Sequence, residues 1–110
     1  KNNYSKVNFK FPKEEKVIKT NKLFLGTMIG DYSRTGISTM LNTGSYIGLG
    51  SNVFGYGFQR QCIPSFAWGE NEKVDFKKLL KTIEAMKLRR KHVLEEAEII
   101  FLENLYKNSK

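Results

Sequence analysis

Residues 23–58 read LFLGTM-IGDYSR-TGISTM-LNTGSY-IGLGSN-VFGYGF when they are divided into blocks of six. An aliphatic residue opens five of the six blocks, and Thr35 opens the other. The fifth place holds a small residue in every block, and the second place is glycine in three of them. The apolar residues follow neither helical spacing nor the alternation of an ordinary strand. A period of six held over 36 residues is typical of a parallel β-helix.

In such a coil each block supplies one short strand on one side of a triangle. The first residue points toward the axis, where burial contributes roughly 1.5–3 kcal/mol. The fifth residue lies near a corner where only a small side chain fits, and glycine or asparagine allows the turn. The inward residues would be Leu23, Ile29, Thr35, Leu41, Ile47 and Val53.

Six blocks make two coils, because three blocks close one. Stacked repeats generally need about three or more units, so we expect this segment to be the last part of a longer β-helix. The alternative is a glycine-rich antiparallel meander, which would show a period of two within each strand.

The next stretch, GYGFQRQCIPSFAWG at 55–69, has the composition of a loop. One interpretation is a plug that closes the open end of the core, and the other is a ligand or subunit contact through aromatic side chains. The aromatic residues concerned are Phe54, Tyr56, Phe58, Phe66 and Trp68.

Two amphipathic helices are expected in the last third of the chain. Asp75 can N-cap a helix that begins at Phe76. The second helix should run from about residue 93 to 106, and we expect both to cap the domain or pack on a neighbouring subunit. The first helix should bury Phe76, Leu79, Leu80, Ile83 and Met86, and the second should bury Leu94, Ala97, Ile100, Phe101 and Leu105.

The net charge of +8 is divided unevenly, with +5 in residues 1–22, zero in 23–70 and +3 in 71–110. Basic ends suit an anionic partner or simply a solvated surface. The sequence contains no RNA-binding signature, zinc-ligand spacing or transmembrane stretch. Cys62 is interpreted as a small apolar filler, and nothing in the sequence links it to His92, the sole histidine.

Three stretches together resemble one family: KNNYS (1–5), FLGTMIGDYSRTGISTMLNTGSYIG (24–48) and GFQRQCIPSFAWG (57–69). They are similar to the C-terminal part of the Bacteroidetes-type sugar nucleotidyltransferases. Those proteins are relatives of the bifunctional N-acetylglucosamine-1-phosphate uridylyltransferase/glucosamine-1-phosphate acetyltransferase. The resemblance implies a mainly β fold, a left-handed parallel β-helix at 1–70 with a C-terminal pair of helices at 71–110.

The resemblance also implies assembly and ligands. Three chains would pack side by side as a homotrimer, and acetyl-CoA lies between neighbouring subunits in the bifunctional relatives. Asn3 and Tyr4 match an Asn-Tyr pair that touches this cofactor. The family's GxGTRL-type loop and metal-binding Asp are absent here, so Mg²⁺ and the sugar phosphate or nucleotide substrate would belong to a nucleotidyltransferase domain outside this segment. His92 does not match the catalytic histidine of the acetyltransferases.

We therefore expect the C-terminal, oligomerising segment of a cytoplasmic sugar-1-phosphate nucleotidyltransferase of nucleotide-sugar biosynthesis. The parent would be an enzyme, and this segment would contribute no catalytic or metal-binding residue. One alternative is an acyltransferase domain that binds acetyl-CoA between subunits. Another is a structural module whose basic ends bind an anionic polymer. Neither nucleic acid nor a membrane is expected as a partner.

Overall fold

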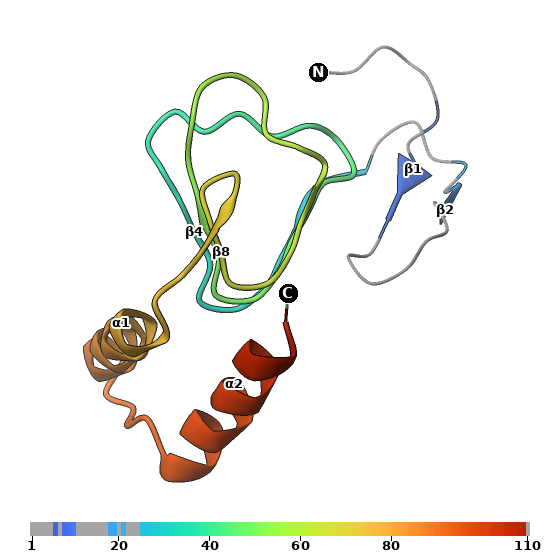
Figure 1. Cartoon of the computed structure of the whole chain (residues 1–110). Helices are drawn as coiled ribbons and strands as arrows, with labels where there is room; N and C mark the ends of the chain where they lie inside the picture. The colour runs from blue at the N-terminus through green and yellow to red at the C-terminus, as the bar shows by residue number, and fades with distance from the viewer. Residues whose placement is uncertain (1–5, 7, 11–17, 20, 22–24, 110) are drawn as a thin grey trace.

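The computed structural model describes residues 6, 8–10, 18, 19, 21 and 25–109. Figure 1 shows a stack of turns, two helices packed at one end of it, and a small pair of strands beside it. The helices are α1 (Phe76–Arg89) and α2 (Glu96–Asn108). The strands are β1 (Asn8–Phe9), β2 (Ile18–Lys19), β3 (Met28–Ile29), β4 (Arg34–Thr35), β5 (Tyr46–Ile47), β6 (Asn52–Val53), β7 (Cys62–Ile63), β8 (Ala67–Trp68) and β9 (Glu72–Lys73).

The turns are joined by parallel pairing between residues that are 18 apart, which is three blocks of six. Strand β3 pairs with β5, so Met28 lies beside Tyr46. Strand β4 pairs with β6, so Arg34 lies beside Asn52. The chain therefore returns over itself once every 18 residues in this part of the structure.

The next turn is two residues shorter. Tyr46 lies beside Cys62 and Asn52 beside Trp68, an offset of 16. Residues 55–69, interpreted from sequence as a loop or plug, thus contain β7 and β8. The block of six resumes as IPSFAW at 63–68, after only four residues at 59–62. That block keeps an aliphatic residue first and a small residue fifth.

The predicted fold class, a mainly β left-handed parallel β-helix, is wrong. The strands form three separate sheets, ordered β1-β2, β3-β5-β7 and β4-β6-β8-β9, and none closes or continues as a solenoid. Two of the sheets include an antiparallel pair, β1–β2 and β8–β9. Helices of 14 and 13 residues accompany strands of two residues, so the described chain has mixed α and β structure. The spacing of six indicates which side chains point inward, but it does not indicate how far a sheet continues.

Corners at the fourth place of the block explain why the strands are so short. Five residues at this place have φ between +59° and +66°: Tyr32, Ser38, Gly44, Gly50 and Phe66. Glycine adopts this conformation freely, whereas the other residues must be held in it by their surroundings. Each corner interrupts the ladder, so a strand covers only the two residues between corners.

Two of the glycines at the second place are required because the next turn passes very close to them. A Cβ on Gly48 would lie 2.4 Å from the backbone nitrogen of Ser65. A Cβ on Gly30 would lie 2.7 Å from the backbone nitrogen of Leu49. The corresponding residue of the last described turn is Pro64.

The interior of the turns is a small apolar cluster. Ile47, Val53, Ile63 and Ala67 are at most 4% exposed and form one core. Ile29, which the sequence also placed inside, is 54% exposed. Its strand β3 lies at the edge of its sheet, so no further turn among the described residues covers it.

Two of the serines at the fifth place, Ser33 and Ser51, connect successive turns. Ser33 donates a hydrogen bond from its Oγ to the Gly48 carbonyl and accepts one from the Ser51 backbone N–H. Ser51 repeats the pattern one turn later, donating to the Pro64 carbonyl at 2.8 Å and accepting from the Ala67 N–H at 3.2 Å. Ser51 is only 1% exposed, so these bonds satisfy backbone groups that water cannot reach.

Helix α1 begins where the sequence indicated. Asp75 is the N-cap, and its carboxylate accepts a hydrogen bond from the Lys77 N–H at 3.0 Å. The predicted apolar face is confirmed: Leu79 and Ile83 are buried, and the other members of the face are half-buried. This face forms the larger core with Phe66, Val74 and Leu102.

Helix α2 has a different buried face from the predicted one. Leu102 is 3% exposed, and Leu94 and Tyr106 pack beside it on the same core. Ile100 and Phe101, which were expected inside, are 55% and 62% exposed. Tyr106, on the buried side, donates from its hydroxyl to the Val74 carbonyl, which helps to hold that side against the turns.

Candidate functional site

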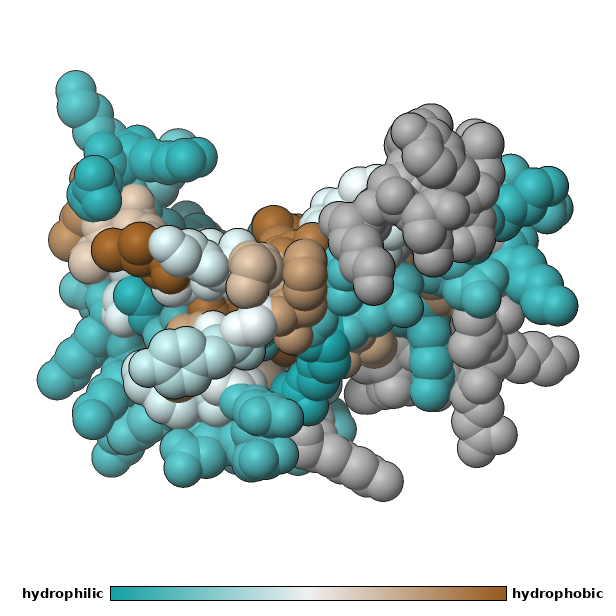
Figure 2. Space-filling view, turned by 90° about the horizontal axis from the view of Figure 1, so that it is seen from above, coloured by the Kyte–Doolittle hydropathy of each residue, from teal (hydrophilic) through white to brown (hydrophobic). Residues whose placement is uncertain are grey.

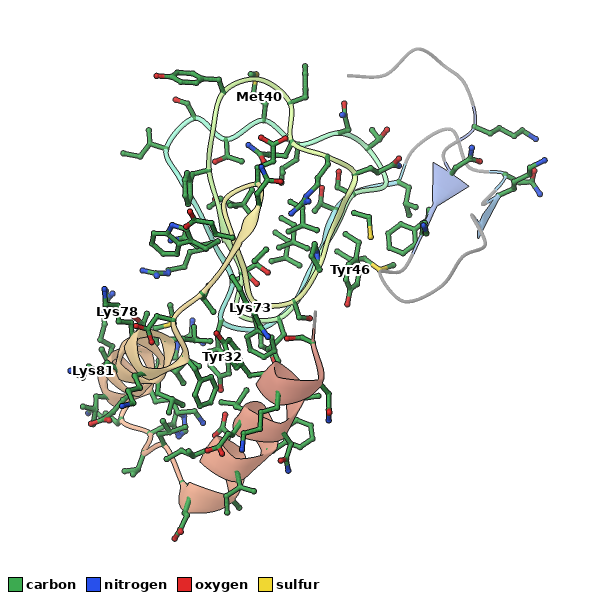
Figure 3. The ribbon with its side chains drawn as sticks, in the orientation of Figure 1. Tyr32, Met40, Tyr46, Lys73, Lys78 and Lys81 are labelled. Atoms are coloured by element: carbon green, nitrogen blue, oxygen red, sulfur yellow. The ribbon has the colours of Figure 1, made fainter. Side chains whose placement is uncertain are left out.

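An apolar surface of the turns extends from the end away from the helices, where Met40 lies, to Trp68, which also lines a cleft beside α1. We call this surface the turn face. Figure 3 places Met40 at this end, opposite Tyr32, Lys73 and both helices. Figure 2 looks onto it from above and shows hydrophobic side chains gathered between two hydrophilic areas. The turn face consists of Ile37, Met40, Phe54, Tyr56, Phe58 and Trp68.

The members of the turn face are brought together by the stacking of turns. Met40 is bridged to Phe58 by parallel backbone pairing. Phe54 and Trp68, from successive turns, meet edge to face with ring centroids 5.5 Å apart. Ile37 and Tyr56 are fully exposed. Stacking thus brings Met40 beside Phe58 and Phe54 beside Trp68, and the exposed Ile37 and Tyr56 lie within three residues of these pairs along the chain.

The size and charge of the turn face are those of a contact surface. Its six residues together expose roughly 700 Å², a sum that includes some backbone and polar atoms, taking about 150–250 Å² for a whole aromatic side chain. Contiguous apolar patches of this size on a soluble protein mark interaction sites. The surrounding segment, 23–70, has zero net charge, so neither sign of charge repels a second copy there.

A cleft lies beside the turn face, between the turns and α1. It has a volume of about 310 Å³ and is lined on one side by Arg34, Asn52 and Trp68. Lys78 and Thr82 of α1 line the opposite side. Cations on both walls and an indole at the rim suit an anionic, partly aromatic ligand.

The cleft is also lined by Glu72, Lys73 and Asp75. Glu72 is exposed in β9, and the other two have structural roles. Asp75 caps α1. Lys73 donates to the carbonyls of Tyr106 and Ser109 and lies 3.9 Å from the centre of the Tyr106 ring. Lys73 is therefore committed to the end of α2, and Arg34 and Lys78 are the cations that could meet a ligand.

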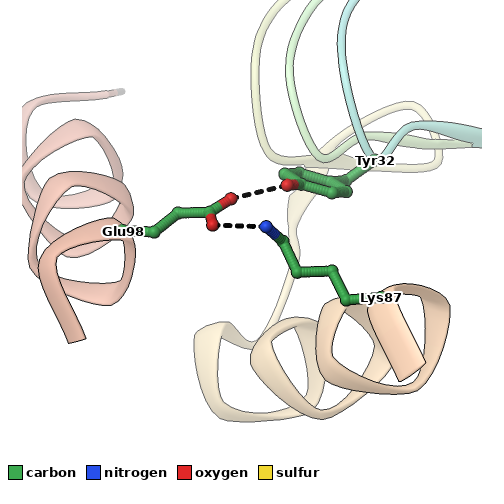
Figure 4. Close-up of polar contacts among 3 residues, drawn as sticks. All are labelled: Tyr32, Lys87 and Glu98. Atoms are coloured by element: carbon green, nitrogen blue, oxygen red, sulfur yellow. Dashed lines mark hydrogen bonds and ion pairs between the residues drawn. The ribbon is translucent and has the colours of Figure 1, made fainter. Parts of the chain in front are cut away.

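A clasp of three residues joins the turns to both helices, as Figure 4 shows. Glu98 of α2 accepts a hydrogen bond from the Tyr32 hydroxyl and forms an ion pair with Lys87 of α1, each at 2.5 Å. The hydrogen bond from Lys87 lowers the pKa of Glu98 below its usual value of 4.5, and that from Tyr32 adds to the effect. The same bonds to Glu98 raise the pKa of Tyr32 above 10.0 and that of Lys87 above 10.5.

A second hollow, of about 800 Å³, lies between the clasp and the end of α1. Arg89, Arg90 and His92 line it together with Asp31. The basic side chains stand at the C-terminal end of α1, where positive charge is favourable against the helix dipole.

The residues considered from sequence for chemistry do not form a catalytic group. Asn3 and Tyr4 lie outside the described residues. Cys62 is half-buried in β7, and burial raises the pKa of its thiol. His92 lies beside α1, and no hydrogen bond joins it to Cys62 in the described part of the chain. No group of three or more His, Cys, Asp or Glu side chains that could hold a metal ion occurs there either.

The aromatic residues of the turn face stand out in the sequence, whereas the clasp does not. Tyr32 and Glu98 are 66 residues apart, and no local pattern connects them. Among the described residues, no helix is long and apolar enough to cross a membrane. No family model, curated protein or solved structure matches the chain.

Proposed function

We propose that this chain is the assembly segment of a sugar-1-phosphate nucleotidyltransferase, with three copies associating through the turn face. The observation that carries the proposal is the exposed apolar turn face on an electroneutral part of a basic protein. An interface of standard size covers about 800 Å² on each partner, which the turn face can supply. The parent activity and the number three rest on the resemblance of residues 1–5, 24–48 and 57–69 to that family.

The segment would hold the parent's subunits together and supply no chemistry of its own. Nucleotidyl transfer, the sugar phosphate and nucleotide substrates and Mg²⁺ would belong to the nucleotidyltransferase domain. Fully exposed Tyr56 and Ile37 would become the centre of the contact, because aromatic and aliphatic anchors dominate interface energetics.

The test is the solution mass of the 110-residue chain and of two variants, Ile37→Asp and Tyr56→Asp. A carboxylate in the buried centre of an interface is strongly unfavourable, so each variant should dissociate to a lower mass. Leu88→Asp is the matched control, since Leu88 is an exposed apolar residue of α1 outside the turn face. If Leu88→Asp dissociates the assembly, or if Tyr56→Asp does not, the turn face is not the contact between copies.

The cleft favours a second candidate function, the binding of an acyl-CoA. Its volume is at the lower limit of ligand pockets, so it could hold one end of such a ligand with Arg34 and Lys78 at the phosphates. Calorimetry with coenzyme A and acetyl-CoA should then show heat that Lys78→Glu abolishes. The control is Lys91→Glu, which reverses the same charge outside the cleft. Equal heats of binding for the two variants would exclude the cleft as the acyl-CoA site.

A further inference from the structure

We infer that the outer face of α2 binds a second copy of this chain, by antiparallel pairing of α2 with α2 across a two-fold axis. This contact is separate from the turn face and goes beyond the proposed function. We call the surface the α2 face. It consists of Ala97, Ile100, Phe101 and Leu105 of α2, together with Val93, three residues before the helix begins.

The α2 face is apolar and has no cover among the described residues. Phe101 is 62% exposed, Ile100 55% and Val93 73%, although each is large and hydrophobic. Together with Leu105 they present roughly 400 Å² of apolar area, which is within the range of patches that mark interaction sites. It is also close to the apolar share of a standard interface of about 800 Å² per partner.

The arrangement of side chains along α2 fits a two-fold contact centred on Phe101. Ala97, Phe101 and Leu105 form one row at intervals of four residues. In an antiparallel pair, Phe101 lies against its own copy, and the small side chain of Ala97 lies opposite the large one of Leu105. An isologous contact requires such self-complementarity, because the same patch serves both partners. Rows spaced by four also interdigitate well between helices.

Charge along α2 selects the antiparallel orientation. Exposed Glu95 and Glu96 stand at the beginning of the helix, and Lys107 stands near its end. Antiparallel pairing sets each acidic end beside the other copy's Lys107, whereas parallel pairing would set like charges together. The helix dipoles also oppose each other favourably in the antiparallel pair. Lys107 forms an exposed ion pair with Glu103 of its own helix, and such pairs are weak enough to be shared.

The experiment measures the mass of the 110-residue chain by light scattering and sedimentation. Phe101→Glu should halve the mass, and Leu88→Glu, at an apolar residue of α1 that is 59% exposed, should leave it unchanged. Far-ultraviolet circular dichroism should show that both variants keep their helices. An unchanged mass for Phe101→Glu would overturn the inference.

A charge exchange tests the orientation. Glu96→Lys should weaken the pairing at least several-fold at low salt, because the introduced lysine would lie near Lys107 of the other copy. The double variant Glu96→Lys/Lys107→Glu should restore it. If the double variant does not recover the pairing that Glu96→Lys weakens, antiparallel pairing would be contradicted.

The measurements test the two proposed contacts separately. If the α2 face alone is correct, the chain is a dimer that Phe101→Glu dissociates and Tyr56→Asp leaves intact. If the turn face alone is correct, the chain is a trimer that Phe101→Glu leaves intact. A monomeric chain at high concentration would overturn both.

Discussion

Glu98 of α2 accepts a hydrogen bond from the hydroxyl of Tyr32, a residue at a corner of the turns. Tyr32 holds a φ of +59°, a conformation that a bulky residue adopts only when its surroundings favour it. The bond to Glu98 is one such influence, and Lys87 completes the clasp from α1. The turns and the two helices therefore depend on one another through three side chains.

Removing the Tyr32 hydroxyl should loosen this connection. Tyr32→Phe deletes a half-buried hydrogen bond to a charged group, which should lower the free energy of unfolding by about 1 kcal/mol after allowance for partial exposure. The measurement is the urea midpoint of unfolding. Tyr32→Phe made in the Glu98→Gln background is the matched control, because the hydroxyl has lost its charged partner there, and the midpoint should change less. Equal effects in the two backgrounds would mean that the bond to Glu98 contributes no stability.

The clasp should also set the pH range of stability. The pKa of Glu98 is depressed below 4.5, so its contribution is complete above that pH and is lost as the pH falls through the lower folded value. The pKa values of Tyr32 and Lys87 are raised above 10.0 and 10.5, so their contributions are complete below those values and are lost as the pH rises further. Stability should form a plateau between about pH 5 and pH 10.

The variant Glu98→Gln separates the clasp from other titrating groups. It should flatten the fall in stability below pH 4.5 and above pH 10 relative to the original chain. The measurement is the urea midpoint at each pH for both proteins. Parallel curves would show that other groups govern the pH dependence.

Gly48 should be intolerant of any side chain. A Cβ there would lie 2.4 Å from the backbone of Ser65, and a backbone atom cannot move aside without shifting a whole turn. We expect Gly48→Ala to lower the free energy of unfolding by about 1–3 kcal/mol. At Gly26 a Cβ would meet nothing within 4 Å, so Gly26→Ala should be neutral or slightly stabilising. Chemical denaturation of the two variants gives the comparison.

Ser51 should contribute more to the free energy of unfolding than Ser45, although each residue is only 1% exposed. Ser51→Ala leaves the Pro64 carbonyl and the Ala67 N–H without their serine partner, at a cost of about 1–3 kcal/mol. Within the described part of the chain, the Ser45 hydroxyl bonds only to the carbonyl of Asn42, three residues before it, so Ser45→Ala should cost less. A larger loss for Ser45→Ala would contradict the role given to the link between turns.

The parts of the structure that local spacing determines could be predicted from the sequence. Asp75 and the apolar positions of α1 gave its start and its buried face. The period of six gave the offset of 18 residues and the inward positions of Ile47 and Val53.

The rest depends on contacts between distant residues. The turn after residue 58 is shortened by two residues, which displaced the pattern and concealed β7 and β8. The buried face of α2 was misassigned because Glu98, which appeared to belong on the surface, faces Tyr32 and Lys87. The structure departs from the predicted coils because its corners fall at the fourth place of the block and because β9 returns antiparallel to β8. Neither feature follows from the spacing of six.

The measurement that tests the central claim most directly is sedimentation equilibrium of the 110-residue chain beside its Tyr56→Asp variant. Assembly through the turn face predicts a mass of three times the 12.7 kDa of one chain, or twice that value when the α2 face is also engaged. The variant should fall to the mass of one chain or of one α2 pair. A mass of one or two chains for the unaltered protein, or a mass that Tyr56→Asp does not change, would contradict the account.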